Sequence, residues 1–537
     1  MTRIEGHAGQ LTVAALQQFG IDVMFTLNGA HIWPFYDAAR DRGMRVVDTR
    51  HEASAAFAAE AYAKLTRRPG LAALTAGPGV TNGISAVTSA MFNGAPLVVL
   101  GGRAPEGRWG AGSLQEFDHV PVLAPITKLA TTVKQAELAG EIVHGAATLA
   151  ASPHRGPVFL DFPFDLFAPT EGEVPDGGAD ISPAADPASI EVLARLVAGA
   201  ERPAFLVGSD AYWDGAWNEL EAAATSLGVP CFFNGLGRGM LPADHSHAFL
   251  RTRGLLKRRA DLVVVIGTPL DFRVGFGSFG DARVAHVVDD ESQTAGHVES
   301  TTVAGDIAVT LAGLANYAGD RVDHTGWLAE LRDAEEAARA AEAPLLEADD
   351  PSIKPTRIYG ELRKRLDRDA IVICDGGDFV SYAGKYVEVH QPGGWLDTGP
   401  YGCLGNGMGY AIAARTVHPD RQIVVMLGDG AAGFSLMDVD SLVRHGLPVV
   451  MVVGNNGIWG LEKHPMQMIY GWDMACDLQP ETRYDEVVRA LGGGGETVTS
   501  PDEIGPALDR AFASGVPYLV NVMTDPGDVY PRTSNLA

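Results

Sequence analysis

Short apolar segments alternate with longer alanine-rich stretches from one end of the chain to the other. Several apolar segments are continuous and rich in β-branched residues, among them PLVVLGG, DLVVVIG, QIVVMLGDG and PVVMVVGNN. Continuous runs of this kind are typical of strands in a parallel sheet that is covered on both faces. The stretches between them have helical length, so the pattern predicts an α/β protein built from doubly wound parallel sheets.

Two changes of composition divide this pattern into three parts. Residues 168–188 are rich in Pro, Gly and Asp and predict a linker, whereas residues 335–355 begin as a helix and end as an acidic, proline-containing linker. We therefore expect three domains, at 1–170, 188–335 and 355–537, each of ordinary domain size. The first and third share one layout, in which glycine-rich turns follow the strands.

Composition excludes several classes of protein. The sequence has 41 Lys and Arg residues and 67 Asp and Glu residues, which gives a net charge of −26. This charge argues against a chain that coats nucleic acid or an anionic membrane. The 4 cysteines are too scattered for a disulfide framework or a zinc site. No apolar run reaches the length of a membrane span, and the first residues lack the apolar core of a signal peptide. We expect a soluble, cytoplasmic protein.

The third domain contains a candidate metal and phosphate site. One buried strand ends at Gly428-Asp429-Gly430, and the next along the chain ends at Asn455-Asn456. Glycines at a strand end let the backbone approach a phosphate, and carboxylate, amide and carbonyl oxygens are the ligands that Mg²⁺ prefers. Two ordinary turns after strands are the alternative, but the two motifs together favour a metal site.

This GDG…NN pattern resembles the thiamin-diphosphate-dependent enzymes. The resemblance extends over essentially the whole chain, and it implies Asp429, Asn456 and the carbonyl of Ile458 as ligands of a Mg²⁺ that anchors the cofactor's diphosphate. Leu404 matches the apolar residue wedged between the cofactor's two rings, although core packing would explain it equally well. The cofactor-binding residues that the resemblance implies are Pro78, Asn82, Gly377, Asp378, Phe379, Gly402, Leu404, Gly428, Gly430, Ala431, Asn456 and Ile458.

The resemblance also assigns a role to Glu52, which opens a predicted helix in RVVDTRHEASAAF. In the family, a glutamate at this place bonds to the pyrimidine ring and promotes the tautomer whose nitrogen removes the thiazolium C2 proton. A surface glutamate at a helix start is the alternative. The Gly-Pro-Gly and Thr-Asn turn that follows, at 77–82, matches the family's pyrimidine site and favours the catalytic role. The resemblance also implies that the pyrimidine and diphosphate sites face each other across two subunits, so we expect a homodimer at minimum and a homotetramer as the assembly.

Three further residues are candidates for the substrate side. His31 lies in LNGAHI, a loop similar to that of benzaldehyde lyase, where the matching histidine assists proton transfer at the substrate hydroxyl. Gln115 lies in GSLQEFDHV and matches an active-centre glutamine of acetolactate synthases, benzaldehyde lyase and 2-hydroxyacyl-CoA lyases. Glu462 follows the metal turn and is a candidate second acid–base group. Each has a structural alternative. His31 would be a structural histidine, Gln115 a glutamine on a helix surface, and Glu462 a partner of Lys463 in a salt bridge.

The middle domain contains the densest basic run of an acidic chain. Its sequence resembles oxalyl-CoA decarboxylase and 2-hydroxyacyl-CoA lyase, and CoA or nucleotide phosphates would require such a patch. A solvated helix face is the alternative. The segment 263–290 resembles a nucleotide half-site in which Asp289 or Asp290 meets a ribose, and relatives bind ADP or FAD there, although an empty site is equally compatible. The candidate residues are Arg251, Arg253, Lys257, Arg258, Arg259 and Asp290.

These features lead to a thiamin-diphosphate- and Mg²⁺-dependent carbon–carbon lyase or carboligase acting on a small molecule. The first hypothesis is a 2-hydroxyacyl-CoA lyase that cleaves its substrate reversibly to formyl-CoA and an aldehyde or ketone. The alternatives are an acetolactate synthase and a benzaldehyde-lyase-like acyloin lyase. A non-catalytic protein of the same fold is disfavoured because Glu52, Asp429 and Asn456 are all present. The ending YPRTSNLA resembles that of 2-hydroxyacyl-CoA lyases and predicts a lid over the active site.

Overall fold

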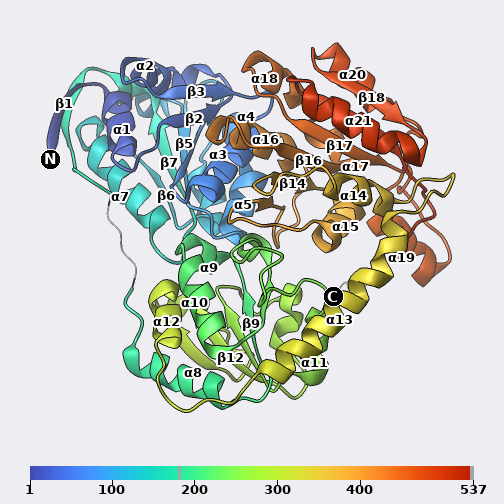
Figure 1. The fold of residues 1–537 in the computed structure, drawn as a ribbon. Helices are drawn as coiled ribbons and strands as arrows, with labels where there is room; N and C mark the ends of the chain where they lie inside the picture. Colours follow the sequence, from blue (N-terminus) through green and yellow to red (C-terminus); the bar gives the residue numbers. More distant parts are fainter. Residues whose placement is uncertain (179–182, 532–537) are drawn as a thin grey trace.

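The computed structural model describes residues 1–178 and 183–531, and it contains three α/β domains (Figure 1). The amino-terminal domain, in blue, and the carboxyl-terminal domain, in orange and red, lie beside each other. The middle domain, in green, lies below both in this view. Each domain is built on a parallel sheet, which confirms the predicted fold class.

The amino-terminal domain has a six-stranded parallel sheet in the order β3-β2-β4-β5-β7-β6. Alternate residues of its strands pack on opposite faces: Leu71 and Ala73 face one apolar core, while Ala72 and Leu74 face the other. The sheet is therefore doubly wound, because both faces must be covered by helices. Its strands are β2 (Val23–Thr26), β3 (Arg45–Asp48), β4 (Gly70–Leu74), β5 (Leu97–Arg103), β6 (Leu129–Thr132) and β7 (Pro157–Pro163). Its helices are α1 (Ala8–Gln17), α2 (Trp33–Asp41), α3 (Glu52–Thr66), α4 (Pro78–Asn82), α5 (Ile84–Phe92), α6 (Val120–Leu123) and α7 (Ala139–Ala151).

The middle domain has a five-stranded parallel sheet in the order β10-β9-β11-β12-β13. Its central strand β11 is buried along its whole length, as its sequence LVVVI requires. The strands are β9 (Pro203–Val207), β10 (Cys231–Phe233), β11 (Leu262–Ile266), β12 (Arg283–Val288) and β13 (Thr301–Ala304). The helices are α8 (Pro187–Gly199), α9 (Ser209–Trp213), α10 (Trp217–Leu227), α11 (Leu256–Arg259), α12 (Ile307–Ala315) and α13 (Thr325–Leu346).

The carboxyl-terminal domain has a six-stranded parallel sheet in the order β15-β14-β16-β17-β19-β18. Its strands are β14 (Ile371–Asp375), β15 (Trp395–Leu396), β16 (Ile423–Gly428), β17 (Val450–Asn455), β18 (Gly494–Val498) and β19 (Tyr518–Met523). Its helices are α14 (Pro355–Arg363), α15 (Gly377–Tyr386), α16 (Asn406–Val417), α17 (Asp429–Ser435), α18 (Val439–Arg444), α19 (Gly460–Tyr470), α20 (Tyr484–Ala490) and α21 (Pro501–Ala513).

The two outer domains pack through α3 and α16. A side chain at Gly409 of α16 would lie 2.7 Å from the carbonyl oxygen of Ser54 in α3, so the helices approach as closely as glycine allows. Lys64 is buried beside them, with its Nζ 2.9 Å from Glu60 and 2.6 Å from the hydroxyl of Tyr410. A single apolar core continues from these helices into all three domains.

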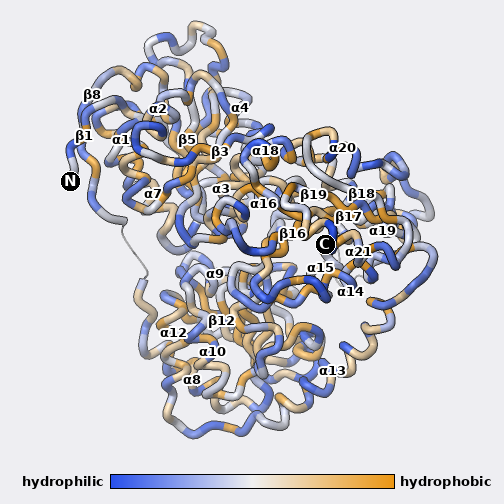
Figure 2. The backbone as a smooth tube through the Cα atoms, turned by 45° about the horizontal axis from the view of Figure 1, so that its top comes forward, coloured by the Kyte–Doolittle hydropathy of each residue, from blue (hydrophilic) through white to orange (hydrophobic). Residues whose placement is uncertain are grey.

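The predicted linkers lie partly within regular structure. Strand β8 (Thr170–Val174) pairs antiparallel with β1 (Thr2–Gly6), so the start of the first linker belongs to the amino-terminal domain. Helix α13 continues through residue 335 and runs from the middle domain to the carboxyl-terminal domain (Figure 1). The strands are apolar and the connecting turns polar along much of the backbone (Figure 2). Among the helices within the described ranges, none is long and apolar enough to cross a membrane.

Candidate functional site

The carboxyl ends of β14, β16 and β17 form the wall of a pocket of about 550 Å³. These three strands are neighbours in the sheet, so the turns that follow them meet at one edge. Helices α15, α17 and α19 begin at this pocket, which points the amino-terminal ends of three helices at it. The amino-terminal ends of α15 and α19 carry partial positive charge and suit an anion. The pocket brings together ten residues of the predicted set: Gly377, Asp378, Phe379, Gly428, Asp429, Gly430, Ala431, Asn456, Ile458 and Glu462.

The carboxylate of Asp429 is held rigidly at the centre of this edge. It is 4% exposed, and its oxygens accept hydrogen bonds from the backbone N–H of Gly457 at 2.6 Å and of Gly430 at 2.9 Å. Burial raises the pKa of Asp429 to about 6, against the opposing effect of these donors. The amide oxygen of Asn456 accepts the N–H of Ile458 at 3.2 Å.

The groups at this edge fit a divalent cation and a diphosphate. The donors that Asp429, Asn456 and Ile458 offer are all oxygens, which are what Mg²⁺ prefers, and a cation would offset the cost of burying the carboxylate. A side chain built on Gly428 would meet nothing within 4 Å, and its φ of −73° suits any residue. No contact among the described residues therefore requires a glycine at 428, and a side chain there would enter the space of the pocket that Gly428 lines.

Asp378 and Phe379 are adjacent in the sequence but have different surroundings in the structure. A side chain on Gly460 would lie 2.3 Å from the Asp378 carboxylate, so this carboxylate lies against the first residue of α19. Phe379 is only 5% exposed and packs on Tyr359, with ring centroids 5.3 Å apart. Its carbonyl accepts a hydrogen bond from the Tyr359 hydroxyl at 2.5 Å. The phenylalanine is a core residue that shapes the pocket wall.

Asp375 is a residue of this edge that the sequence reasoning missed. It ends β14 and is fully buried, and its carboxylate accepts the N–H groups of Gly405 at 3.0 Å and Gly407 at 2.9 Å. It thereby fixes the turn that carries Gly402 and Leu404. Burial raises the pKa of Asp375 to about 7. The signal available was an acidic residue at the end of an otherwise apolar strand, ICDGG.

Gly402 and Leu404 do not line the pocket described above. Gly402 has φ +69°, a left-handed conformation that favours glycine, and Leu404 is half-buried.

Glu462 is exposed in the first turn of α19 and lines the pocket. Its neighbour Lys463 forms an ion pair with Asp477 and lies 3.7 Å from Asp473.

The amino-terminal domain brings a second group of predicted residues together. Glu52 is the first residue of α3 and is 8% exposed. Its Oε2 accepts a hydrogen bond from the side-chain amide of Asn82 at 3.0 Å. Pro78 begins α4, the short helix that ends at Asn82. The structure therefore places the predicted pyrimidine-site residues Glu52, Asn82 and Pro78 around one turn.

His31 and Gln115 lie near the neighbouring turn, Thr75–Gly77. The Nδ1 of His31 lies 3.5 Å from the hydroxyl of Thr75, and the ring is 8% exposed. Burial lowers the pKa of His31, which favours the neutral form of its imidazole. Gln115 has φ +58°, and a side chain on Gly77 would lie 3.0 Å from its Cβ.

The two groups do not share a pocket within the described chain. The pocket at the β16 edge is lined only by residues between Pro355 and Asp528. Glu52, His31 and Gln115 belong to the amino-terminal domain and do not line it. Within one chain, the residues described here thus form two separate half-sites.

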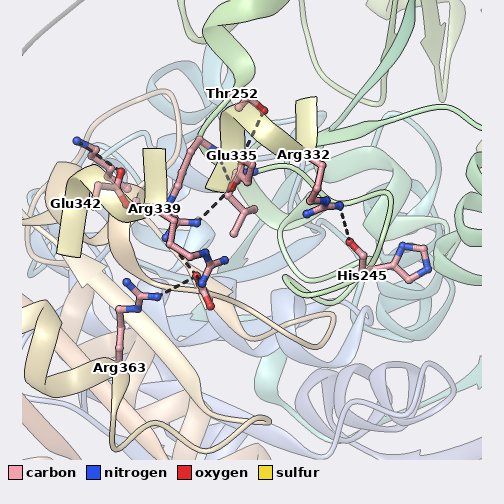
Figure 3. A network of polar contacts seen from close by, with 12 residues as sticks. His245, Thr252, Arg332, Glu335, Arg339, Glu342 and Arg363 are labelled. Carbon is pink, nitrogen blue, oxygen red and sulfur yellow. Dashed lines mark hydrogen bonds and ion pairs between the residues drawn. The ribbon is translucent and has the colours of Figure 1, made fainter. Parts of the chain in front are cut away.

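The basic run of the middle domain does not form a single cationic surface. The Arg251 side chain is 2% exposed and contacts Glu342 at 2.7 Å, Glu388 at 3.2 Å and Glu335 at 3.3 Å. Figure 3 shows Glu335 and Glu342 projecting from the helix that links the middle and carboxyl-terminal domains. Arg251 is thus neutralised by glutamates and holds that helix in place, because a buried guanidinium needs acidic partners.

The other members of the run point elsewhere. Arg253 donates to the carbonyl of Arg273, and burial lowers its pKa to about 10. Arg259 pairs with Glu330 at 3.0 Å, while Lys257 and Arg258 are exposed. Asp290 caps the short turn 291–293 by accepting the N–H of Ser292 at 2.9 Å.

Asp289, the other acid predicted to meet a ribose, contacts the amino-terminal domain. It is 1% exposed, and its carboxylate lies 3.1 Å from the Nδ1 of His154. Asp210 lies 3.6 Å from the same nitrogen, and Arg155 pairs with Asp214 at 2.9 Å. These ion pairs join the two domains. The predicted lid falls largely on residues 532–537, which lie outside the described residues.

The chain matches three domain families along its length. Residues 6–122 match the thiamine pyrophosphate enzyme, N-terminal TPP binding domain. Residues 190–314 match the central domain of the same enzymes, and residues 375–522 match their C-terminal TPP binding domain.

Curated relatives match nearly the whole chain. The sequence is 49% identical over 540 residues to the acetolactate synthase large subunit IlvG of Mycobacterium tuberculosis, covering 99% of this chain and 98% of that protein. It is 33% identical over 558 residues to 2-hydroxyacyl-CoA lyase 2 of Caenorhabditis elegans, covering 94% of this chain and 87% of the relative. The lyase of the same name from Homo sapiens is 30% identical over 572 residues, with coverage of 96% and 90%.

Proposed function

Because the chain belongs to the thiamin-diphosphate-dependent enzymes, a family of carbon–carbon carboligases and lyases, we propose that it is an acetolactate-synthase-type carboligase. It would decarboxylate a 2-oxo acid such as pyruvate and join the remaining two-carbon unit to a second 2-oxo acid. The observation that carries this proposal is the 49% identity to an acetolactate synthase over 99% of the chain. This favours the synthase over the 2-hydroxyacyl-CoA lyase that the sequence suggested first.

The residues of the β16 edge suit the anchoring of the cofactor. Asp429, Asn456 and the carbonyl of Ile458 would hold Mg²⁺, and Gly428 with Gly430 would border the diphosphate. When bound, thiamin diphosphate supplies a carbanion that adds to a substrate carbonyl. The amide donors on Asp429 keep its carboxylate fixed, so the metal ligand is preorganised before the ion arrives.

The residues of the amino-terminal half-site suit proton control and substrate positioning. Glu52 offers a buried carboxylate that Asn82 orients, and it would hold a proton at the pyrimidine ring. A neutral His31 can accept a proton and return it at a substrate hydroxyl. Gln115 would orient the substrate through its amide, and Glu462 would serve as a second acid–base group beside the metal pocket.

A second copy of the chain would complete the site. The metal pocket and the Glu52 group do not share a lining within one chain, so the proposal requires each pocket to face the Glu52 group of a partner. A homodimer is the smallest assembly that satisfies this, and a homotetramer contains two such pairs. Sedimentation velocity of the holoenzyme tests this, because an active monomer would contradict it.

A nucleotide, ADP or FAD, would bind in a pocket that the middle domain shares with its neighbours. A pocket of about 860 Å³ lies between the three domains, lined by Ser209 and Arg273 of the middle domain, by Lys64 and by Asp397. It is large enough and polar enough for part of an ADP or FAD molecule. Asp289, however, is bound to His154, so it would contribute little to ribose recognition.

The 2-hydroxyacyl-CoA lyase is the second candidate, supported by the relatives of that name at 30–33% identity. The contacts of the basic run argue against the lyase, because Arg251 forms ion pairs with three glutamates and cannot also bind a CoA phosphate. Within this run, Lys257 and Arg258 are exposed and could contact CoA phosphates, whereas the exposed Arg259 pairs with Glu330. A benzaldehyde-lyase-like acyloin lyase rests on the likeness of the His31 loop and on the matching Gln115.

One experiment separates these activities. Holoenzyme is incubated separately with pyruvate, a 2-hydroxyacyl-CoA and benzoin, and the products are identified by mass spectrometry. The proposal expects acetolactate and carbon dioxide from pyruvate, and no product with Glu52→Gln. Cleavage of the CoA ester without any acetolactate would overturn it in favour of the lyase, and a double Lys257→Ala, Arg258→Ala variant should then raise the KM for the CoA ester.

A further inference from the structure

A buried histidine supports the turn next to the substrate-side residues. His119 is fully buried, and its Nε2 lies 2.9 Å from the backbone nitrogen of Gly77. Its Nδ1 lies 3.1 and 3.2 Å from the two oxygens of Asp161, which is also fully buried. Since a backbone N–H can only donate, Nε2 must accept, and the ring proton is on Nδ1 and is donated to Asp161. The two partners therefore select one neutral tautomer of His119.

The charge of Asp161 is balanced by a cation rather than by the histidine. The Nη1 of Arg103 lies 2.9 Å from Asp161 and 3.3 Å from Asp118. The guanidinium also lies over the ring of Trp109, 3.6 Å from its centroid. Because Trp109 and Asp118 lie on either side of Gln115 in the sequence, Arg103 holds the loop that carries this glutamine at both ends.

The hydrogen bond from Gly77 connects this cluster to the site. Gly77 has φ +62°, and a side chain there would lie 3.0 Å from the Cβ of Gln115 and 3.1 Å from its carbonyl oxygen. The Gly77 turn and the Gln115 backbone, itself at φ +58°, are therefore packed against each other. A shift of Gly77 would displace Gln115 and the start of α4 at Pro78.

We propose that His119, oriented by Asp161, is a positioning residue that fixes the Gly77 turn and through it Gln115 at the substrate. This inference rests on the proposed function, because it assigns Gln115 to a substrate. An apolar residue of similar size would fill the same space, but it would leave the Gly77 N–H without its acceptor and would remove the imidazole donor from the Asp161 carboxylate, which Arg103 would still contact. The role thus depends on the two nitrogen atoms of the ring and not on packing alone.

Two variants of similar polarity separate the nitrogen atoms. The amide of His119→Gln reaches the position of Nε2 and can accept the Gly77 N–H. The shorter amide of His119→Asn reaches only the position of Nδ1 and can contact Asp161 alone. We expect His119→Gln to keep kcat within about threefold of wild type, and His119→Asn to lose about tenfold or more, since small displacements at a reacting centre are costly. The affinity for thiamin diphosphate should be unchanged in both.

A matched control is the buried His324 of the middle domain, whose ring nitrogens contact the carbonyls of Leu227 at 2.8 Å and Ala200 at 3.0 Å. His324→Asn should lower the melting temperature without changing kcat of the folded enzyme. If it lowers kcat as His119→Asn does, the loss is general destabilisation and the proposal is wrong.

A readout that does not depend on activity completes the test. Hydrogen exchange of the peptide around residues 70–80 should be faster in His119→Asn than in His119→Gln, because the Gly77 N–H loses its acceptor. Equal exchange and equal kcat in the two variants would overturn the positioning role. If wild type were inactive on every substrate while exchange still differed, the proposed function would fail and the structural role of His119 would stand. Should His119→Asn not fold, the comparison is repeated with Asp161→Asn, for which we expect the same faster exchange and lower kcat.

Discussion

The amino- and carboxyl-terminal domains use the same scaffold for different chemistry. Both have a six-stranded parallel sheet, and in both the second strand of that sheet along the chain lies at one edge, followed by the first, third, fourth, sixth and fifth. In each, the candidate residues follow the carboxyl ends of these strands. The carboxyl-terminal edge offers glycines and oxygen ligands, whereas the amino-terminal edge offers Glu52, His31 and the supported Gly77 turn. The topology fixes where a site forms, and the side chains decide what it binds.

The largest expected difference concerns Glu52. Glu52→Gln should lower kcat by at least about 100-fold, because a group acting in proton transfer contributes this much, while the affinity for thiamin diphosphate stays within about threefold. Steady-state kinetics and calorimetric titration measure the two quantities. Glu141→Gln, an exposed glutamate in the first turn of α7, is the control and should be neutral. Activity within a few-fold of wild type would remove Glu52 from the mechanism.

A substitution at the carboxyl-terminal edge should weaken cofactor binding, whereas Glu52→Gln should leave cofactor binding nearly unchanged. Asp429→Ala removes the central oxygen ligand, so we expect Mg²⁺ and thiamin diphosphate binding to weaken by about 100-fold or more, as with other lost metal ligands and their supports. Removal of the metal by a chelator should likewise abolish activity, and added Mg²⁺ should restore it. Binding that persists in Asp429→Ala would mean that the two edges do not divide their tasks as proposed.

A smaller effect is expected from the pocket glycine. Gly428→Ala adds one methyl group that contacts no protein atom within 4 Å, so the melting temperature should change little. The affinity for thiamin diphosphate should fall by about tenfold, or about 1.4 kcal/mol, because the methyl group intrudes on the ligand space. The control Gly433→Ala also meets no atom within 4 Å and should leave binding unchanged. Equal behaviour of the two variants would place the diphosphate elsewhere.

The smallest effect concerns pH and Asp375. Its pKa is raised by burial to about 7, so the native state binds a proton more tightly than the unfolded chain. Its contribution to stability is therefore full below about pH 4 and is lost as the pH rises to about 7. Relative to Asp375→Asn, the free energy of unfolding of the wild type should fall over this range in denaturant titrations. Parallel curves for the two proteins would contradict the assignment.

The site was only partly predictable from the sequence. The strand-end glycines, Asp429 and Asn456 were identifiable because parallel strands bring their carboxyl ends to one edge and the motif names the ligand chemistry. His119, Asp161 and Asp375 were not identified, because a polar residue within an apolar segment shows its role only through its partners. The partners of His119 and Asp161 lie 42 positions or more away in the sequence.

The sequence by itself determined the α/β class, the three domains' parallel sheets and the pairing of a GDG…NN motif with a distant glutamate. These follow from local periodicity and from short motifs, which depend on neighbouring residues. Only the tertiary structure determined which groups the basic run contacts. Whether Arg251 contacts a phosphate or three glutamates depends on the placement of α13. It also decided that the two half-sites lie apart in one chain, since the packing of α3 on α16 sets the distance between their sheets.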